Sequence, residues 1–172
     1  SYVLKNIVLV DIMTIATGFV LRAVAGAMVL NVIITHWLLV CMGLLALFLA
    51  IGKRRHELVL LEQGAGDHRR ILQEYSVPML DQMISIVTGS LIIAYSLTTF
   101  YAPAVPREPY PVLMATIPFV IYGIFRYLYL IYQRGSGGSP DELVLKDAPL
   151  AIDIALWGFT VLVLLYFFRT PG

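Results

Sequence analysis

Charged side chains gather directly after a long apolar run. Residues 44–64 are LLALFLAIGKRRHELVLLEQG, and the charges begin with Lys53, Arg54, Arg55 and Glu57. Lysine offers phosphate oxygens a point charge and arginine a bidentate fork, while a carboxylate can recruit a divalent cation. The cluster therefore predicts a site for a ligand with several phosphates. Basic residues also flank the cytoplasmic ends of membrane helices, so a simple stop signal remains the alternative on spacing alone.

A second group of charges lies inside apolar runs. It comprises Asp11, Arg22, Asp81, Arg126 and Asp153. A charge near the centre of a bilayer costs about 2.5 kcal/mol or more, so such side chains usually face a cavity or a partner. Each could instead snorkel or hold the bundle together in a buried pair. Because most of the set lies near one membrane face, we predict a polar cavity that opens to the cytosol.

The composition indicates what kind of chain must position these charges. Of the 172 residues, 59% are hydrophobic and 13% charged, and the mean hydropathy is +0.84, which excludes an ordinary soluble domain. The formal net charge of +1 gives no basic surface for nucleic acid, so no nucleic-acid partner is expected. Cys41 is the single cysteine, which excludes a disulfide framework.

Five segments are long and apolar enough to cross a bilayer as helices, which takes about 20 residues. Strands are excluded because lipid cannot satisfy an unpaired sheet edge. We therefore predict an all-α polytopic membrane helical bundle with cytoplasmic loops over residues 52–76 and 133–149. In the second loop, Ser139 and Glu142 predict a helix that begins at Pro140. The predicted spans are about 7–30, 35–51, 77–101, 112–132 and 150–168.

Basic residues are divided unequally between the two ends of the predicted bundle. One side carries only Arg107 and Arg169. Since cytoplasmic loops carry the excess of lysine and arginine, the other side is predicted to be cytoplasmic and the C-terminus external. The cations of the predicted cytoplasmic side are Lys5, Lys53, Arg54, Arg55, Arg69, Arg70, Arg134 and Lys146.

Several stretches resemble one family of membrane enzymes. They are SYVLKN, ATGFVLRAVAGA, ALFLAIGKRRHEL, ILQEYSVPMLDQM, IPFVIYGIFRYLYLIY and GGSPDELVLKDAPL. Together they resemble the C-terminal part of the UbiA prenyltransferase superfamily and, within it, the decaprenyl-phosphate phosphoribosyltransferase branch. The resemblance runs along nearly the whole chain, and the GKRRxE and GGSPDE–LxxD blocks are its branch-specific parts.

The resemblance implies a nine-helix bundle with a central cavity, in which residues 1–172 are the C-terminal part of one domain. The five predicted spans would then be the last five. The family's first acidic motif would precede Ser1, so we expect this chain to be a fragment that is inactive alone. The family's second, usually Asp-rich region is replaced here by the cluster around Lys53. This departure fits the branch whose soluble substrate is phosphoribosyl pyrophosphate.

The implied activity is that of a pentosyltransferase in the plasma membrane with its active site facing the cytoplasm. Such an enzyme moves 5-phosphoribosyl from phosphoribosyl pyrophosphate to polyprenyl (decaprenyl) phosphate and releases pyrophosphate, for the lipid-linked arabinose donor of cell-wall synthesis. The resemblance also implies Mg²⁺, with its main ligands expected in the missing N-terminal part. Membrane lipids are the remaining expected partners.

Roles for individual residues follow from the resemblance together with the charge pattern. Glu57 is the one candidate metal ligand, and no other is identified in this chain. The predicted catalytic residues are Lys53, Glu57, Asp11 and Asp81. The residues predicted to bind or steer substrate phosphates are Lys5, Arg22, Arg54, Arg55, Arg69, Arg70, Arg126 and Lys146.

Three other functions remain open at the level of sequence. A UbiA-type enzyme could move a prenyl group from polyprenyl diphosphate to an aromatic acceptor, but that chemistry favours two acidic motifs, and the second region here is basic. A membrane transporter would also carry charges in its spans, although no repeat with interrupted spans is found. The third alternative is a non-catalytic membrane scaffold.

Overall fold

Long apolar helices make up most of the molecule. The computed structural model describes residues 9–62, 75–135 and 140–169, and within these ranges all regular structure is helical. The elements are α1 (Val10–Val29), α2 (His36–Glu62), α3 (Val77–Phe100), a 3-10 turn (Val112–Thr116), α4 (Ile117–Gln133), α5 (Pro140–Lys146) and α6 (Ala148–Phe168). The all-α prediction is confirmed.

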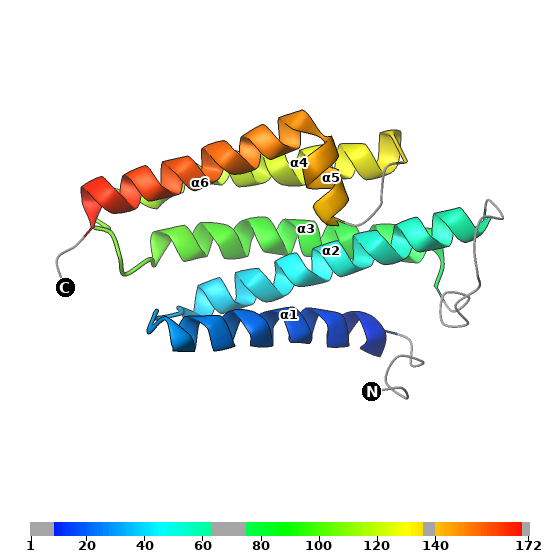
Figure 1. The fold of residues 1–172 in the computed structure, drawn as a ribbon, viewed down its shortest axis with the longest axis horizontal. Helices are drawn as coiled ribbons and strands as arrows, with labels where there is room; N and C mark the ends of the chain where they lie inside the picture. The colour runs from blue at the N-terminus through cyan, green and yellow to red at the C-terminus, as the bar shows by residue number, and fades with distance from the viewer. Residues whose placement is uncertain (1–8, 63–74, 136–139, 170–172) are drawn as a thin grey trace.

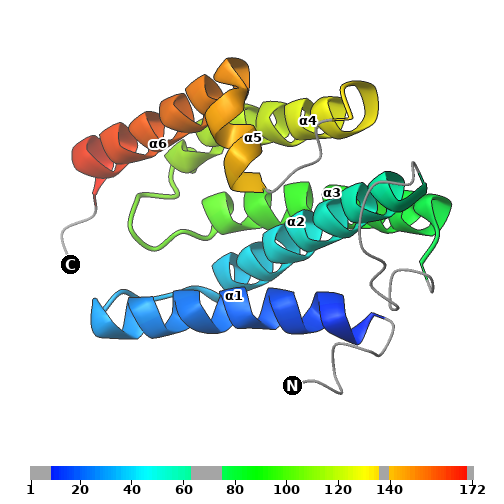
Figure 2. The same cartoon turned by 45° about the vertical axis from the view of Figure 1, so that its right-hand side comes forward.

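The long helices lie side by side with their axes roughly aligned (Figure 1). α2 packs against α1 and α3, and α4 packs against α6. The short α5 lies beside the start of α6 and runs across the direction of the long helices, as Figure 2 shows from a second side. Five helical segments of the described chain are long and apolar enough to cross a membrane, so the chain is a multi-pass membrane protein.

The helix of the second predicted span extends further than expected. We expected a helix over 35–51 followed by a cytoplasmic loop over 52–76, but α2 continues without a break to Glu62. Lysine, arginine, glutamate and leucine are good helix formers, and the buried Leu58 continues the face of α2 that packs on the core. The first part of that predicted loop is therefore helix, and its charges have fixed helical spacing.

The starts of α3, α5 and α6 agree with their local signals. The Ser76 side chain accepts a hydrogen bond from the Met79 N–H at the start of α3. Asp147 accepts one from the Leu150 N–H at the start of α6. Both are ordinary N-cap interactions, which satisfy backbone donors that have no partner within the helix. α5 begins at Pro140, as predicted, within the expected loop 133–149.

The apolar core lies between α2, α3 and α4. Ile51, Leu80 and Ile84 are almost fully buried there. The rings of Phe48 and Tyr127 meet with centroids 5.1 Å apart and join α2 to α4. In α1 and α6 few side chains are buried, as expected for helices whose remaining faces meet lipid or further protein.

Candidate functional site

Most of the predicted site residues come together at one end of the bundle. We call this the charged end; α1, α3 and α6 begin there, and α2 and α4 end there (Figure 1). Three separate ion-pair clusters, each linking different helices, lie at this end.

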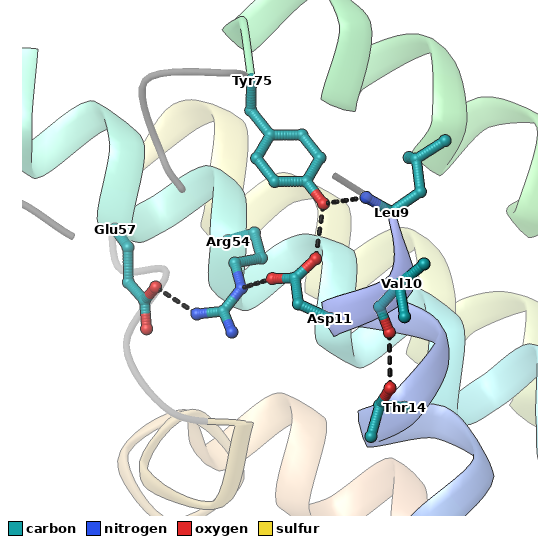
Figure 3. A network of polar contacts seen from close by, with 7 residues as sticks. All are labelled: Leu9, Val10, Asp11, Thr14, Arg54, Glu57 and Tyr75. Atoms are coloured by element: carbon teal, nitrogen blue, oxygen red, sulfur yellow. Dashed lines mark hydrogen bonds and ion pairs between the residues drawn. The ribbon is translucent and has the colours of Figure 1, made fainter. Parts of the chain in front are cut away.

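The first cluster joins α1 to α2 through Arg54 (Figure 3). The Arg54 Nε donates to Asp11 Oδ2 at 2.9 Å, and its Nη1 donates to Glu57 Oε2 at 2.6 Å. Arg54 is 6% exposed and Asp11 3% exposed. A buried ion pair needs such close hydrogen bonds, because both charges have lost their water. Arg54 is thus already bonded to two carboxylates.

Tyr75 completes this cluster and was not predicted. Its hydroxyl donates to Asp11 Oδ1 at 2.6 Å and accepts from the Leu9 N–H at 2.8 Å (Figure 3). Burial, together with the hydrogen bond to Asp11, raises the pKa of Tyr75 to about 12. A single tyrosine before a helix carries no periodic signal, so nothing in the sequence distinguished it.

The second cluster joins α2, α3 and α4. Arg55 Nε donates to Asp81 Oδ1 at 2.5 Å, and the Tyr132 hydroxyl donates to the same oxygen at 2.9 Å. The Arg55 guanidinium also lies 4.3 Å from the centroid of the Tyr132 ring, a cation–π contact. Arg55 and Asp81, which we predicted separately as a phosphate ligand and a catalytic residue, are therefore partners of each other.

The third cluster joins α4 to the start of α6. Arg126 donates from Nε to Asp147 Oδ2 at 2.9 Å and from Nη2 to Oδ1 at 2.8 Å, a bidentate pair. The hydrogen bonds from Arg126 hold the pKa of Asp147 below its ordinary value. Sequence reasoning did not select Asp147. Its position just before Ala148 and Pro149, typical of a helix N-cap, is the signal that could have found it.

The remaining predicted cations are placed differently. Lys53 is exposed on α2 and forms no ion pair with any residue that the structure describes. Lys146 is exposed on α5 and contacts Glu142 at 3.2 Å. Arg22 lies about three turns further along α1 than Asp11, over the Phe19 ring at 5.6 Å, and is not brought to the charged end. The predicted phosphate ligands Lys5, Arg69 and Arg70 lie outside the described residues.

A cavity of about 320 Å³ opens at the charged end beside α5. We call it the α5 pocket. Its polar lining comes from α2, the end of α4, α5 and the N-cap of α6, and its apolar lining includes Leu130 and Leu143. The polar side chains that line it are His56, Arg134, Glu142, Lys146 and Asp147.

The described residues do not by themselves form a magnesium site. Within the ranges that the structure covers, no group of three or more histidine, cysteine or acidic side chains could hold a metal ion. Glu57, the one predicted candidate, is bonded to Arg54. A single carboxylate with a neutralising partner is a poor site for a cation that prefers several oxygen ligands.

Curated relatives are similar to nearly the whole chain. A decaprenyl-phosphate phosphoribosyltransferase of Mycolicibacterium smegmatis is 32% identical over 173 residues, which cover 95% of this chain and 53% of that protein. One of Corynebacterium glutamicum is 29% identical over 163 residues, covering 94% of this chain and 48% of that protein. One of Mycobacterium tuberculosis is 28% identical over 158 residues, covering 92% and 51%. The predicted resemblance is confirmed.

The similarity has a defined extent. The chain spans about half the length of the curated relatives that it matches. No family model matches the chain. The aligned region covers more than nine-tenths of this chain.

Proposed function

We propose that the full-length protein is an integral membrane pentosyltransferase. It would move 5-phosphoribosyl from phosphoribosyl pyrophosphate to a polyprenyl phosphate such as decaprenyl phosphate, and release pyrophosphate. The observation that carries the proposal is the similarity along more than nine-tenths of the chain to relatives named for this activity. The lipid-linked product would serve as a precursor of an arabinose donor for cell-wall synthesis.

The reaction defines what the site must supply. The bond from ribose C1 to pyrophosphate breaks, the electron pair leaves with the pyrophosphate, and an oxygen of the lipid phosphate forms the new bond to C1. Positive charge develops at C1 and negative charge on the leaving group. Catalysis therefore needs cations placed at the leaving group and a lipid phosphate held in line with the breaking bond.

Lys53 is the residue that we assign to the leaving group. It is exposed on α2 at the charged end and forms no ion pair within the described residues. Its charge is therefore available to a phosphate. Glu57 follows one helical turn later on the same face, partly exposed, with one oxygen bonded to Arg54. We assign Glu57 to the ribose hydroxyls, because a carboxylate can accept hydrogen bonds from them.

Arg54 and Arg55 receive a different role from the one first expected. Each is bonded to carboxylates at short distance, Arg54 to Asp11 and Glu57 and Arg55 to Asp81. A phosphate would have to displace these partners. We therefore propose that both arginines position α2, and with it Lys53 and Glu57, relative to the neighbouring helices.

We propose that the reaction uses Mg²⁺, although the described residues alone form no Mg²⁺ site. We propose that its ligands lie mainly outside the described residues, and we assign no step of the reaction to it. We also propose that the charged end faces the cytoplasm of a plasma membrane. In the described chain Lys53, Arg54, Arg55, Arg134 and Lys146 lie at this end, and the positive-inside rule supports that orientation.

The test uses the full-length protein, including any residues beyond this chain, in detergent with Mg²⁺. Labelled phosphoribosyl pyrophosphate and polyprenyl phosphate are supplied, and label that enters the lipid phase is counted. We expect transfer that is lost in Lys53→Ala. Arg107→Ala, which removes an exposed cation beyond the far end of α3, should leave transfer unchanged.

Two outcomes would replace the proposal. Prenylation of an aromatic acid from polyprenyl diphosphate, without pentosyl transfer, would make the protein a prenyltransferase of the more common kind. Flux of a solute into liposomes without any product would identify a transporter. In both cases the assignment of Lys53 to the pyrophosphate of phosphoribosyl pyrophosphate would be wrong.

A further inference from the structure

The α5 pocket has the size of a small-molecule site. Its volume of about 320 Å³ lies near the lower end of the range for ligand pockets, about 300 to 1,000 Å³. A sugar phosphate fits such a volume, whereas a polyprenyl chain does not. No role has been assigned so far to two of its basic side chains, His56 and Arg134.

Basic side chains reach the α5 pocket from three separate elements. His56 comes from α2, Arg134 is the C-cap residue that follows α4, and Lys146 lies in the last turn of α5. A phosphate is usually bound by basic side chains that converge on it from different directions, because each can donate a hydrogen bond to a different oxygen.

The acidic residues of the α5 pocket oppose a bound phosphate only weakly. Both oxygens of Asp147 accept hydrogen bonds from Arg126, which neutralises the charge. Glu142 pairs with Lys146 at 3.2 Å, but their side chains are 58% and 75% exposed. Exposed pairs of this kind contribute little free energy, about 0 to 1 kcal/mol. A phosphate can therefore replace Glu142 as the partner of Lys146 with little loss of free energy.

The position of the α5 pocket connects it to the proposed catalytic residues. Lys53, His56 and Glu57 have i, i+3 and i+4 spacing, so they share one face of α2. Because His56 lines the pocket, this is the face of α2 beside it. Lys53 and Glu57 do not line the α5 pocket, but both lie within about one helical turn of His56, which does.

We propose that the α5 pocket binds a terminal phosphomonoester through His56, Arg134 and Lys146. The identity of the ligand rests on the proposed function, in which two substrates carry a terminal phosphate. It is either the 5-phosphate of the pentosyl donor or the headgroup of the lipid acceptor. Both present the same dianionic group, and kinetics with each substrate separates them.

The first experiment measures binding without turnover. Ribose 5-phosphate is titrated by calorimetry into the full-length protein in lipid nanodiscs. We expect His56→Ala and Lys146→Ala each to weaken binding about tenfold or more, the loss typical of one charge-assisted hydrogen bond. Glu142→Gln should act in the opposite direction and tighten binding, because it removes a negative charge and frees Lys146. Arg107→Ala is the control of unchanged affinity.

The second experiment measures KM for each substrate in the same variants. A raised KM for phosphoribosyl pyrophosphate alone assigns the α5 pocket to the donor, and a raised KM for polyprenyl phosphate alone assigns it to the lipid headgroup. If neither KM nor the affinity for ribose 5-phosphate changes, the pocket is not a phosphate site. Lys146 is exposed and His56 half-buried, so their alanine variants should fold.

The two proposals can fail separately. One result would be that ribose 5-phosphate binds, that the variants change its affinity as expected, and that no pentosyl group is transferred. This result would support the α5 pocket and overturn the proposed function. Transfer with unchanged KM values and unchanged affinity in all three pocket variants would retain the function and overturn the pocket. Absence of both binding and transfer would overturn both.

Discussion

Arg54 of α2 and Asp11 of α1 form an ion pair with Nε and Oδ2 2.9 Å apart, and both side chains are almost completely buried. The two residues are far apart in sequence, and each lies in an apolar helix. Their pairing explains how the membrane-spanning part of the chain tolerates both charges. The pair also joins α2 to α1 at the position next to Lys53.

The first prediction concerns this pair. Arg54→Met and Asp11→Asn should each destabilise the protein, by up to about 3 to 5 kcal/mol, because each breaks a buried ion pair from one side. The double variant should lose much less than the sum of the two. Thermal unfolding of the four proteins in one detergent measures the coupling.

Lys53→Met is the matched control for that measurement. It removes a cation from the neighbouring position of α2, but this side chain is exposed and forms no ion pair within the described residues. Its effect should lie within about 0.5 kcal/mol. An Arg54→Met variant as stable as Lys53→Met would show that the buried pair does not hold α1 to α2.

The second prediction concerns pH and Tyr75. Its folded-state pKa is raised to about 12, above the value of about 10 for an unfolded tyrosine. Stability contributed by the protonated hydroxyl is complete below pH 10 and is lost as the pH rises through 12, because the unfolded state releases the proton first. The free energy of unfolding should therefore fall over this window.

Other tyrosines ionise in the same pH range, so the comparison must be between variants. Tyr75→Phe should be less stable at pH 8 and lose less stability between pH 10 and 12 than the unmutated protein. Tyr110→Phe removes an exposed tyrosine and should follow the unmutated protein throughout. Equal pH dependence in all three would contradict the role of Tyr75.

The third prediction concerns the contact between α2 and α4. A Cβ added at Gly52 would lie 2.9 Å from the Tyr127 hydroxyl oxygen, and that hydroxyl is buried without a hydrogen-bond partner among the described residues. Gly52→Ala should be destabilising. Tyr127→Phe should be neutral or stabilising, because it removes an unpaired buried polar group. The double variant should tolerate alanine at position 52 better than Gly52→Ala alone does.

Gly89→Ala provides the control for the glycine substitution. Nothing lies within 4 Å of a Cβ added at Gly89 of α3. Alanine there should be neutral or stabilise the helix by up to about 1 kcal/mol. If Gly52→Ala behaves like Gly89→Ala in thermal melts, the close approach of α2 to Tyr127 is not a constraint.

The fourth prediction separates the two functions of Asp147, which caps α6 and pairs with Arg126. Asp147→Ser keeps a capping oxygen and loses the pair, whereas Asp147→Ala loses both. Alanine should therefore cost about 1 kcal/mol more than serine. Unfolding measured by tryptophan fluorescence at neutral pH gives this difference, and identical stabilities would contradict the capping role.

Acid should weaken the same pair. Since Arg126 lowers the pKa of folded Asp147 below its unfolded value, the stabilisation is present above the ordinary pKa of aspartate. It is lost as the pH falls through the lowered pKa. Asp147→Ser should thus show a flatter stability profile below pH 4 than the unmutated protein does. A profile with the same slope would mean that Arg126 does not stabilise the ionised carboxylate.

The helices could be predicted well because their signal is local. A span needs about 20 apolar residues in a row, and each such run in this chain became a helix. The end of α2 was wrong by three turns because Lys53 and its neighbours were taken as the end of the span. A charge ends the apolar run, but lysine, arginine and glutamate continue a helix readily.

The partners within the site could not be predicted, because they depend on helix packing. The cost of burying charge indicated that Asp11 and Asp81 would have partners, and both have them. The sequence does not show which face of α1 packs against α2, so Arg54 could not be predicted as the partner of Asp11. Tyr75 and Asp147 lie between spans, where no periodicity selects a residue. The same cost of burying charge led to the prediction that Arg22 belongs to the site, but Arg22 lies away from the charged end.

The length of α2 couples the charged end to the lipid around it. The apolar part of the helix, from His36 to Ile51, is about 24 Å long at 1.5 Å per residue, shorter than a hydrocarbon core of about 30 Å. A hydrophobic mismatch of this kind is relieved by local thinning of the bilayer, by snorkelling of the flanking side chains or by oligomerisation. Lys53 and Glu57 belong to the same rigid helix, so a thicker membrane would draw them toward hydrocarbon. Turnover should therefore be highest in bilayers of short acyl chains and decline as the chains lengthen.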